Sequence, residues 1–263
     1  MKKLISMVVL ASLMFTVSAC SNQEAEEGAE TEKDTLILGT SADYPPYEFK
    51  KNIDGEDQYV GLDIEFAKEV AKKAGKELEI VDMPFKSLLL ELEIGKIDFV
   101  ASGLAYSDER AEKYDLSSPY YNVKQVVVTL KDNVDTYNSI ESMIGKSVGV
   151  QTGTIQEQIA NREMDESKVI SMDKVPNIIM EVKTGKIEGI ILEEPVAEVF
   201  ISQHEDLAIS FEVVDHTNGT KIMAVKQGNT ELLEVINETI TEVTDSGLFD
   251  EFMEDAVALA SEE

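Results

Sequence analysis

The chain has 263 residues but only one cysteine, Cys20, and this scarcity excludes two kinds of chemistry. One cysteine cannot form an intramolecular disulfide, and the folded part has no thiol for catalysis. The two histidines, His204 and His216, show no metal-type spacing to carboxylates. We interpret both as surface or structural residues, and expect neither a metal site nor a Ser-His-Asp triad. The sequence also lacks a P-loop and a G-x-G-x-x-G motif, so we expect no cofactor.

Positive charge is scarce as well. The chain has 23 Lys and Arg residues against 52 Asp and Glu residues, which gives a formal net charge of −29 at pH 7. Such a chain repels phosphate backbones, so nucleic acid is excluded as an expected partner. The acidity mainly indicates solubility.

The apolar run near the N-terminus is too short to cross a bilayer. It extends over Leu4–Val17, whereas a membrane-spanning helix needs about 20 apolar residues. Lys2 and Lys3, the short run and the small residues before Cys20 are typical of a secretory signal peptide, which we assign to residues 1–19. The pattern also resembles the bacterial lipobox, which implies that Cys20 is lipid-modified and anchors an extracytoplasmic protein to the cell membrane. An ordinary signal peptide with a chance cysteine is the alternative.

Residues 20–35 are predicted to be a lipidated acidic tether. The segment 21–35, SNQEAEEGAETEKDT, is rich in acids and has no large apolar residue. It cannot bury a core and is expected to be disordered. A flexible chain of this length reaches roughly 20 Å, which would hold a folded domain clear of a membrane surface.

Residues 36–263 contain the same alternation of strands and helices twice. The first series has predicted strands at 36–39, 78–83 and 97–101 with helices at 62–74 and 85–92. The second has strands at 147–151, 169–172 and 187–192 with helices at 154–162 and 176–184. Similar tetrapeptides, Gly95-Lys96-Ile97-Asp98 and Gly185-Lys186-Ile187-Glu188, introduce the third strand each time. This pattern predicts an α/β fold of two similar lobes, each a mainly parallel sheet flanked by helices.

Two further predicted strands suggest how the lobes are joined. They lie at 126–130 and 221–225, and helices follow at 230–246 and 248–258. The economical topology assigns 36–121 and 222–263 to lobe 1, and 122–221 to the hinge and lobe 2. The chain then crosses between the lobes twice, in a two-strand hinge.

Four polar segments follow predicted strands. They are Asp43–Phe49, a rigid turn with two prolines; Ser102–Arg110; Thr152–Glu157, which contains a T-x-x-E capping box; and Glu193-Glu194-Pro195. Ligands of open α/β sheets bind outside the carboxyl ends of the strands, so these segments predict one shared site. Each of two features also has a purely structural alternative. The capping box can serve only to cap its helix, and Arg110 can be a surface residue paired with Asp108 or Glu112.

These segments resemble the polar-amino-acid family of solute-binding proteins of ABC importers, which have the two-lobed type II periplasmic-binding fold. The resemblance covers about 36–258 and is carried by residues 39–47, 60–64, 102–110, 118–121, 145–154 and 193–197. It implies a protein that is not an enzyme, and that captures a free L-amino acid between closing lobes and delivers it to an ABC permease. The implied ligand-binding residues are Tyr44, Phe85, Ser102, Gly103, Ala105, Arg110, Thr154, Ile155, Gln156 and Glu193.

The resemblance also implies how the two charges of an amino acid are held. Arg110 would clamp the α-carboxylate together with the backbone N–H groups of Ala105 and Ile155. Glu193 and the Gly103 carbonyl would hold the α-ammonium. Two departures matter, because Ala105 stands where the family often has Ser or Thr, and Glu193 stands where Asp is usual.

The remaining implied contacts concern the ligand's side chain. Tyr44 and Phe85 would flank it, and Thr154 and Gln156 would add polar contacts from lobe 2. The acids Asp43, Glu48 and Asp63 lie near the corners of lobe 1 and would suit a cationic side chain, with Asp63 better explained as structural. Ser41 stands where some basic-amino-acid binders have an acid, so arginine or lysine is favoured over glutamine only narrowly.

Two readings from other classes remain open at this point. One is an enzyme on the same fold, resembling prephenate or arogenate dehydratases, for which Glu193 is the only candidate general acid. The other is a structural or adhesive surface lipoprotein, which predicts that no amino acid stabilises the chain.

Overall fold

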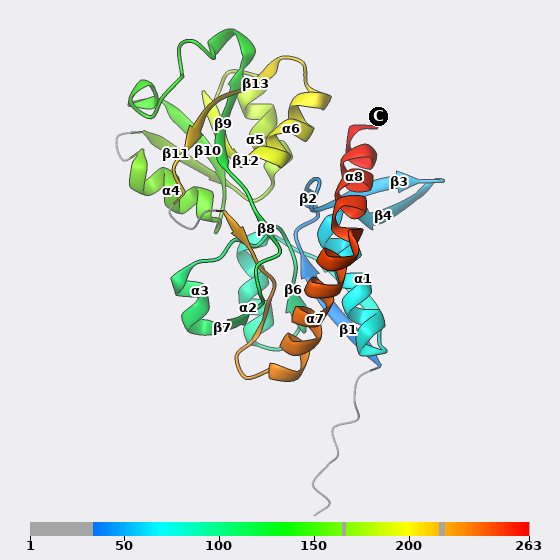
Figure 1. Cartoon of the computed structure of the whole chain (residues 1–263). Helices are drawn as coiled ribbons and strands as arrows, with labels where there is room; N and C mark the ends of the chain where they lie inside the picture. Colours follow the sequence, from blue (N-terminus) through cyan, green and yellow to red (C-terminus); the bar gives the residue numbers. More distant parts are fainter. Residues whose placement is uncertain (1–33, 165–166, 216–218, 263) are drawn as a thin grey trace, which may run out of the picture. The chain divides into compact units, whose positions relative to one another are not determined.

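A computed structural model describes residues 34–164, 167–215 and 219–262. The predicted signal peptide, Cys20 and nearly all of the predicted tether lie outside the described residues. The described chain is built on two five-stranded sheets, with one three-stranded and one two-stranded sheet beside them. Figure 1 shows the two large sheets in separate masses, which we call lobe 1 and lobe 2.

Lobe 1 contains the sheet with strand order β5-β1-β6-β15-β7. β5 and β6 pair parallel with β1, and β15 runs antiparallel between β6 and β7. The strands are β1 (Thr35–Thr40), β5 (Glu77–Asp82), β6 (Phe99–Val100), β7 (Tyr114–Leu116) and β15 (Ala224–Lys226). The helices are α1 (Leu62–Ala74), η1 (Phe85–Ser87), α2 (Leu88–Glu93), α3 (Asp108–Lys113), α7 (Thr230–Ser246) and α8 (Leu248–Ser261).

Lobe 2 repeats this arrangement in the order β11-β10-β12-β9-β13. β11 and β12 pair parallel with β10, and β9 runs antiparallel between β12 and β13. The strands are β9 (Gln125–Leu130), β10 (Ser147–Gln151), β11 (Lys168–Met172), β12 (Gly189–Glu193) and β13 (Leu207–Val213). The helices are η2 (Lys131–Asn133), η3 (Glu141–Met143), α4 (Ile155–Glu163), α5 (Val175–Lys183) and α6 (Glu194–Gln203). The predicted α/β fold with two similar lobes is confirmed.

Gly39 and Gly149 occupy equivalent places in the two lobes, one in β1 and the other in β10. A Cβ on Gly39 would collide with Ile97, and one on Gly149 would collide with Ile178. Each sheet therefore packs closely at this position, and a larger residue there would require Ile97 or Ile178 to shift.

The two-strand connection between the lobes consists of β8 (Tyr121–Asn122) and β14 (Thr220–Lys221), which pair antiparallel (Figure 1). The prediction of one strand over 221–225 was wrong, because β14 ends at Lys221 and β15 begins at Ala224. After Lys221 the chain leaves the hinge and enters the sheet of lobe 1. The predicted strand is therefore divided between β14, which pairs with β8, and β15, which pairs with β6 and β7. The lobe boundaries at 121/122 and 221/222 stay a prediction.

A meander after β1 was missing from the sequence-based elements. It consists of β2 (Asp43–Tyr44), β3 (Glu48–Ile53) and β4 (Glu56–Val60), and its far end projects from lobe 1 in Figure 1. The turn between β3 and β4 uses positive φ at Asp54 and Gly55. Much of this hairpin is charged and exposed, so it shows no apolar alternation for a pattern to detect.

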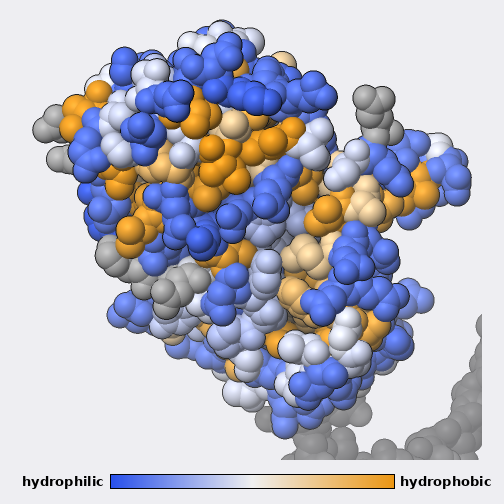
Figure 2. Space-filling model, turned by 45° about the horizontal axis from the view of Figure 1, so that its top comes forward, coloured by the Kyte–Doolittle hydropathy of each residue, from blue (hydrophilic) through white to orange (hydrophobic). Residues whose placement is uncertain are grey.

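The surface agrees with the acidic composition. Figure 2 shows a largely hydrophilic face, with hydrophobic side chains gathered on one mass and along the hollow beside it. Among the described residues, no helix is both long and apolar enough to cross a membrane.

Candidate ligand-binding site

A pocket lies between the lobes, where β6, β10 and β12 end. All ten residues of the sequence-based set line it, and Gln151, which that set did not contain, is also part of the lining. Gln151 is the last residue of β10, directly before the Thr152–Glu157 corner. Its position at the carboxyl end of a strand was therefore the available signal for including it.

Arg110 is a buried cation that forms no ion pair with an acid of the described chain, although the charge of Glu109 on the same helix raises its pKa somewhat. It lies in α3, whose N-cap Ser107 accepts a hydrogen bond from the Arg110 backbone N–H at 3.3 Å. Its guanidinium donates to the carbonyls of Ala105 and, at 3.2 Å, Gly153, and lies 5.8 Å from the centre of the Phe85 ring. Burial lowers the pKa of Arg110 to about 10. The alternative of a surface Arg110 paired with an acid on its own helix does not describe this geometry.

The capping box opens α4 on the lobe 2 side of the pocket. The Thr154 hydroxyl accepts from the Glu157 N–H at 3.3 Å, as the sequence predicts. The Glu157 carboxylate reaches one residue further back, to the Gly153 N–H at 2.7 Å. The N-terminus of α4, which begins at Ile155, therefore faces the same pocket as Arg110, and helix N-termini favour anions.

Glu193 ends β12 and is only 1% exposed. Its Oε1 accepts from the Lys221 ammonium and, at 3.3 Å, from the Gln156 amide. The Lys221 ammonium also donates to the Gly103 carbonyl at 2.7 Å. The resemblance assigned Glu193 and the Gly103 carbonyl to a ligand's ammonium. In this structure the Lys221 ammonium donates a hydrogen bond to both groups.

Lys221 was missed as a site residue. The only signal was a lone charge at the start of the apolar run Ile222–Val225, which is equally typical of an ordinary strand end.

Tyr44 connects the lobes through its hydroxyl. Its Oη accepts from the Gln156 amide and from the Glu193 backbone N–H, each at 3.4 Å. Its ring stacks on Tyr47 at 5.9 Å between centroids. Burial raises the pKa of Tyr44 well above its ordinary value, so it acts as a neutral phenol.

The lobe 1 side of the pocket rests on two buried acids. Asp63 accepts from the Gly103 N–H at 2.7 Å and from the Tyr120 hydroxyl at 2.8 Å, which is the structural role preferred from the sequence. Glu48 accepts from the Ser102 hydroxyl at 2.9 Å, so Ser102 stands between it and the pocket. Burial raises the pKa of Asp63 to about 6 and that of Glu48 well above its ordinary value.

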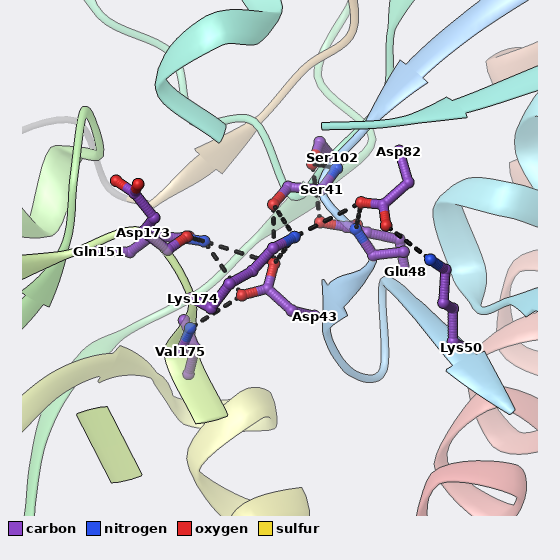
Figure 3. Close-up of polar contacts among 11 residues, drawn as sticks. Ser41, Asp43, Glu48, Lys50, Asp82, Ser102, Gln151, Asp173, Lys174 and Val175 are labelled. Carbon is purple, nitrogen blue, oxygen red and sulfur yellow. Dashed lines mark hydrogen bonds and ion pairs between the residues drawn. The ribbon is translucent and has the colours of Figure 1, made fainter. Parts of the chain in front are cut away.

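Asp43 lies in a second polar cluster between the lobes, drawn in Figure 3. We define this Asp43 cluster as Ser41, Asp43, Asp82, Gln151, Lys174 and Val175. The Asp43 carboxylate accepts from the Val175 N–H at 2.8 Å and from the Ser41 hydroxyl at 2.8 Å. Lys174 lies between it and Asp82, at 3.6 Å and 3.4 Å.

The Asp43 contact with Val175 is a helix cap supplied from the opposite lobe. α5 begins at Val175, and its own N-cap residue, Lys174, has no side-chain acceptor to offer. Asp43 satisfies this N–H instead, so it is already engaged and is not free for the cationic side chain of a ligand in this arrangement.

The described residues contain no group of His, Cys, Asp and Glu side chains suited to hold a metal ion. His204 lies on the surface of lobe 2, with its Nδ1 3.0 Å from the Lys183 ammonium. His216 lies outside the described residues.

Comparison with known proteins gives a consistent answer. Residues 36–256 match the family described as bacterial extracellular solute-binding proteins, family 3. The arginine-binding extracellular protein ArtP of Bacillus subtilis (strain 168) is 35% identical over 252 residues, which cover 94% of each chain. A probable histidine-binding protein of Campylobacter jejuni is 30% identical over 253 residues, covering 95% of this chain and 96% of the relative.

A solved structure agrees in fold. It is the amino acid ABC transporter substrate-binding protein AbpA from Streptococcus pneumoniae bound to L-arginine. Its TM-score is 0.85 at 35% identity, and the match covers 88% of this chain and 97% of that chain. The family resemblance and the type II fold expected from the sequence are thereby confirmed, and the dehydratase reading is set aside because the family is not one of enzymes. The chain belongs to the bacterial extracellular solute-binding proteins of family 3.

Proposed function

We propose that this protein captures a free L-amino acid between its two lobes and delivers it to the membrane subunits of an ABC importer. One observation carries the proposal. Arg110, a buried cation that forms no ion pair with a described acid, shares a pocket with Glu193, a buried acid whose Oε2 accepts no hydrogen bond in this geometry although the Tyr47 hydroxyl interacts with the carboxyl. A zwitterion that leaves water needs both of its charges matched, because an unpaired buried charge is very costly.

In this proposal Arg110 and the backbone N–H groups of Ala105 and Ile155 hold the α-carboxylate. Glu193 and the Gly103 carbonyl hold the α-ammonium. Arg110 belongs to lobe 1 and Glu193 to lobe 2, so the ligand makes its full set of contacts only when the lobes are closed. This difference in contacts is what shifts the population towards the closed form.

The ligand's side chain is assigned to the remaining walls of the pocket. Tyr44 and Phe85 flank it, and the polar groups Ser102, Thr154 and Gln156 surround it, with Gln151 added by the structure.

Arginine is our first candidate ligand, lysine the second and glutamine the alternative. The ArtP relative is named for arginine binding and the AbpA structure holds L-arginine, which supports this order.

The lipid anchor at Cys20 belongs to the proposal as well. The family is extracellular, and the N-terminal pattern resembles a lipobox. An anchored tether would confine the receptor near its importer and raise its effective concentration there. Metabolic labelling with a lipid precursor tests this part, and a Cys20→Ala chain should lose both the label and retention at the membrane.

A thermal-shift screen of the twenty amino acids tests capture itself. A ligand at about 100 times its Kd adds roughly 2.7 kcal/mol of stability. Arg110→Met should weaken amino acid binding by about 2–5 kcal/mol, so the thermal shift at the same ligand concentration should be much smaller. Arg162→Met is the matched control, because Arg162 is half-exposed in α4 and pairs with Glu163. No response to any amino acid would favour the structural or adhesive reading instead.

A further inference from the structure

Lys221 is held in place from several sides. Its side chain is 0% exposed. Its backbone pairs with Tyr121 in the hinge, forms a bridge to Ala105, and accepts from the Tyr120 N–H at 3.1 Å. The ammonium also lies 5.6 Å from the centre of the Tyr47 ring. These hinge contacts fix the backbone of Lys221, and its ammonium lies beside the pocket, where it donates to Glu193 and to the Gly103 carbonyl, two groups that line it.

The ammonium of Lys221 faces buried acids on three elements. It forms an ion pair with Glu193 of lobe 2. It also lowers the pKa values of Asp63 and Glu48 of lobe 1, although burial keeps both raised. Lys221 is therefore the cation that these three carboxyl groups share.

The two oxygens of the Glu193 carboxylate differ in their hydrogen bonds. Oε1 receives the Lys221 ammonium and the Gln156 amide. Oε2 is buried and accepts no hydrogen bond from the described residues in this geometry, although the Tyr47 hydroxyl, which is also buried without a partner, interacts with the carboxyl and lowers its pKa. One oxygen is thus committed to the protein, while the other can still accept a further hydrogen bond.

Burial raises the pKa of Glu193, and Lys221 is the largest influence that lowers it. Without that cation a carboxyl group at this depth favours its neutral form. A neutral Glu193 cannot balance the charge of a ligand ammonium. The titratable and charged groups around Glu193 are Lys221, Asp63, Tyr44, Tyr47, Tyr120 and Tyr121.

We propose that Lys221 is a positioning residue that keeps Glu193 ionised and holds its Oε1, so that Oε2 and the second lone pair of the Gly103 carbonyl, whose first lone pair accepts from Lys221, remain for the ligand's α-ammonium. This inference rests on the proposed function. The Lys221 ammonium and the ligand's α-ammonium then share the Glu193 carboxylate. The opposite possibility is that Lys221 occupies the site of the ligand's ammonium and competes with it. Removal of the Lys221 charge should weaken amino acid binding under the proposal and strengthen it under competition.

The experiment compares the wild-type protein with Lys221→Met and with Lys124→Met, a control at an exposed lysine beside the hinge that pairs with Glu212. The Kd for L-arginine is measured by calorimetry between about pH 6 and pH 8. Lys221→Met should bind about tenfold or more weakly near pH 7 and regain affinity as the pH rises, because Glu193 then loses its proton. The wild type and Lys124→Met should show a smaller dependence on pH, set by Asp63 and Glu48, so the difference between their profiles and that of Lys221→Met is the quantity compared. Lys221→Met binding as tightly as wild type, or more tightly, would overturn the proposal in favour of competition.

Lys221→Arg separates charge from shape. It keeps a cation in the same place, so its profile should follow that of the wild type even if its affinity falls. A Lys221→Arg profile that rises with pH like that of Lys221→Met would contradict the proposal. If Lys221→Met does not fold, the double variant Lys221→Met/Glu193→Gln should fold, because the unpaired Glu193 carboxyl is then the cause of the failure. A double variant that also fails to fold would contradict the proposal.

A readout without ligand keeps this inference distinct from the proposed function. Carbon NMR of the Glu193 carboxyl, assigned with Glu193→Gln, follows its titration directly. It should titrate at a higher pH in Lys221→Met than in wild type, and equal titration would refute the charge effect. Absence of amino acid binding by the wild type would instead count against the proposed function.

Discussion

Two polar clusters join the lobes, and they differ in how completely they exclude water. The side chains of Glu193, which lines the pocket, and Lys221, which pairs with it, are 1% and 0% exposed. In the Asp43 cluster, drawn in Figure 3, the Asp43 side chain is itself only 7% exposed, but those of Lys174 and Asp82 are 34% and 18% exposed. An unpaired charge is costly in the first setting and tolerable in the second, where water can replace a lost partner. We infer that the pocket pair determines whether the site works, and that the Asp43 cluster adjusts how firmly the lobes stay together.

The largest expected effect comes from removing the pocket's acid. Glu193→Gln takes away the ion-pair partner of the buried Lys221 ammonium, which should lower the free energy of unfolding by about 3–5 kcal/mol. Chemical denaturation without ligand measures it. Glu194→Gln is the control, because Glu194 is the next residue in the chain, is partly exposed and lies outside the pocket lining. Equal effects of the two changes would abolish the contrast between buried and exposed acids.

The second effect concerns pH and Asp63. Burial raises its pKa from 3.8 to about 6, so between these values the folded protein binds more protons than the unfolded chain. Stability contributed by this group is therefore present at low pH and lost as pH rises towards and through about 6. Asp63→Asn should flatten the fall in unfolding free energy over this range by up to about 1.4 kcal/mol per pH unit. An unchanged slope would show that Asp63 titrates normally.

A smaller effect is expected in the Asp43 cluster. Asp43→Ala removes the cap on the Val175 N–H and the contacts with Ser41 and Lys174. A lost cap costs about 1–2 kcal/mol, so amino acid affinity should fall roughly five- to thirtyfold although the Asp43 side chain is not in the pocket lining. Calorimetry measures this loss, and Asp57→Ala, in the exposed hairpin, is its control. A hundredfold loss would instead place Asp43 in contact with the ligand.

The smallest effect concerns Lys86 and Asp173, which pair at 2.7 Å between the lobes and are each about half exposed. Lys86→Met should change affinity by roughly twofold or less, and the change should vanish in high salt, because exposed pairs are screened. Titrations at two salt concentrations measure this. A larger effect that persists in high salt would mean that exposure does not govern these inter-lobe contacts.

Much of the fold follows from local sequence signals. The repeated strand–helix series gave both sheets, and α1 ends at Gly75 in the left-handed conformation that its position suggested. These elements are encoded within a few residues of one another, so periodicity and turn chemistry reveal them. The ten site residues came from the family resemblance; all of them except Phe85 lie in the four polar segments that follow strands, and the topology brings those segments to one edge.

The contacts that close the lobes are not local in this sense. Lys221 meets Glu193 across 28 positions, and Asp43 meets the Val175 N–H across 132. Nothing near Lys221 distinguishes a buried ion pair from a strand end, and nothing near Asp43 shows that a distant helix lacks its own cap. Charge pairing over such separations depends on the three-dimensional packing of both lobes.

The central claim is that one pocket reads both charges of an amino acid. Calorimetric titration of the mature protein with L-arginine, with agmatine, which lacks the α-carboxylate, and with 5-guanidinopentanoate, which lacks the α-amino group, tests it directly. The account predicts binding of L-arginine and a loss of about a hundredfold or more for each analogue, because each leaves Arg110 or Glu193 unmatched. An analogue that binds as tightly as L-arginine would contradict it.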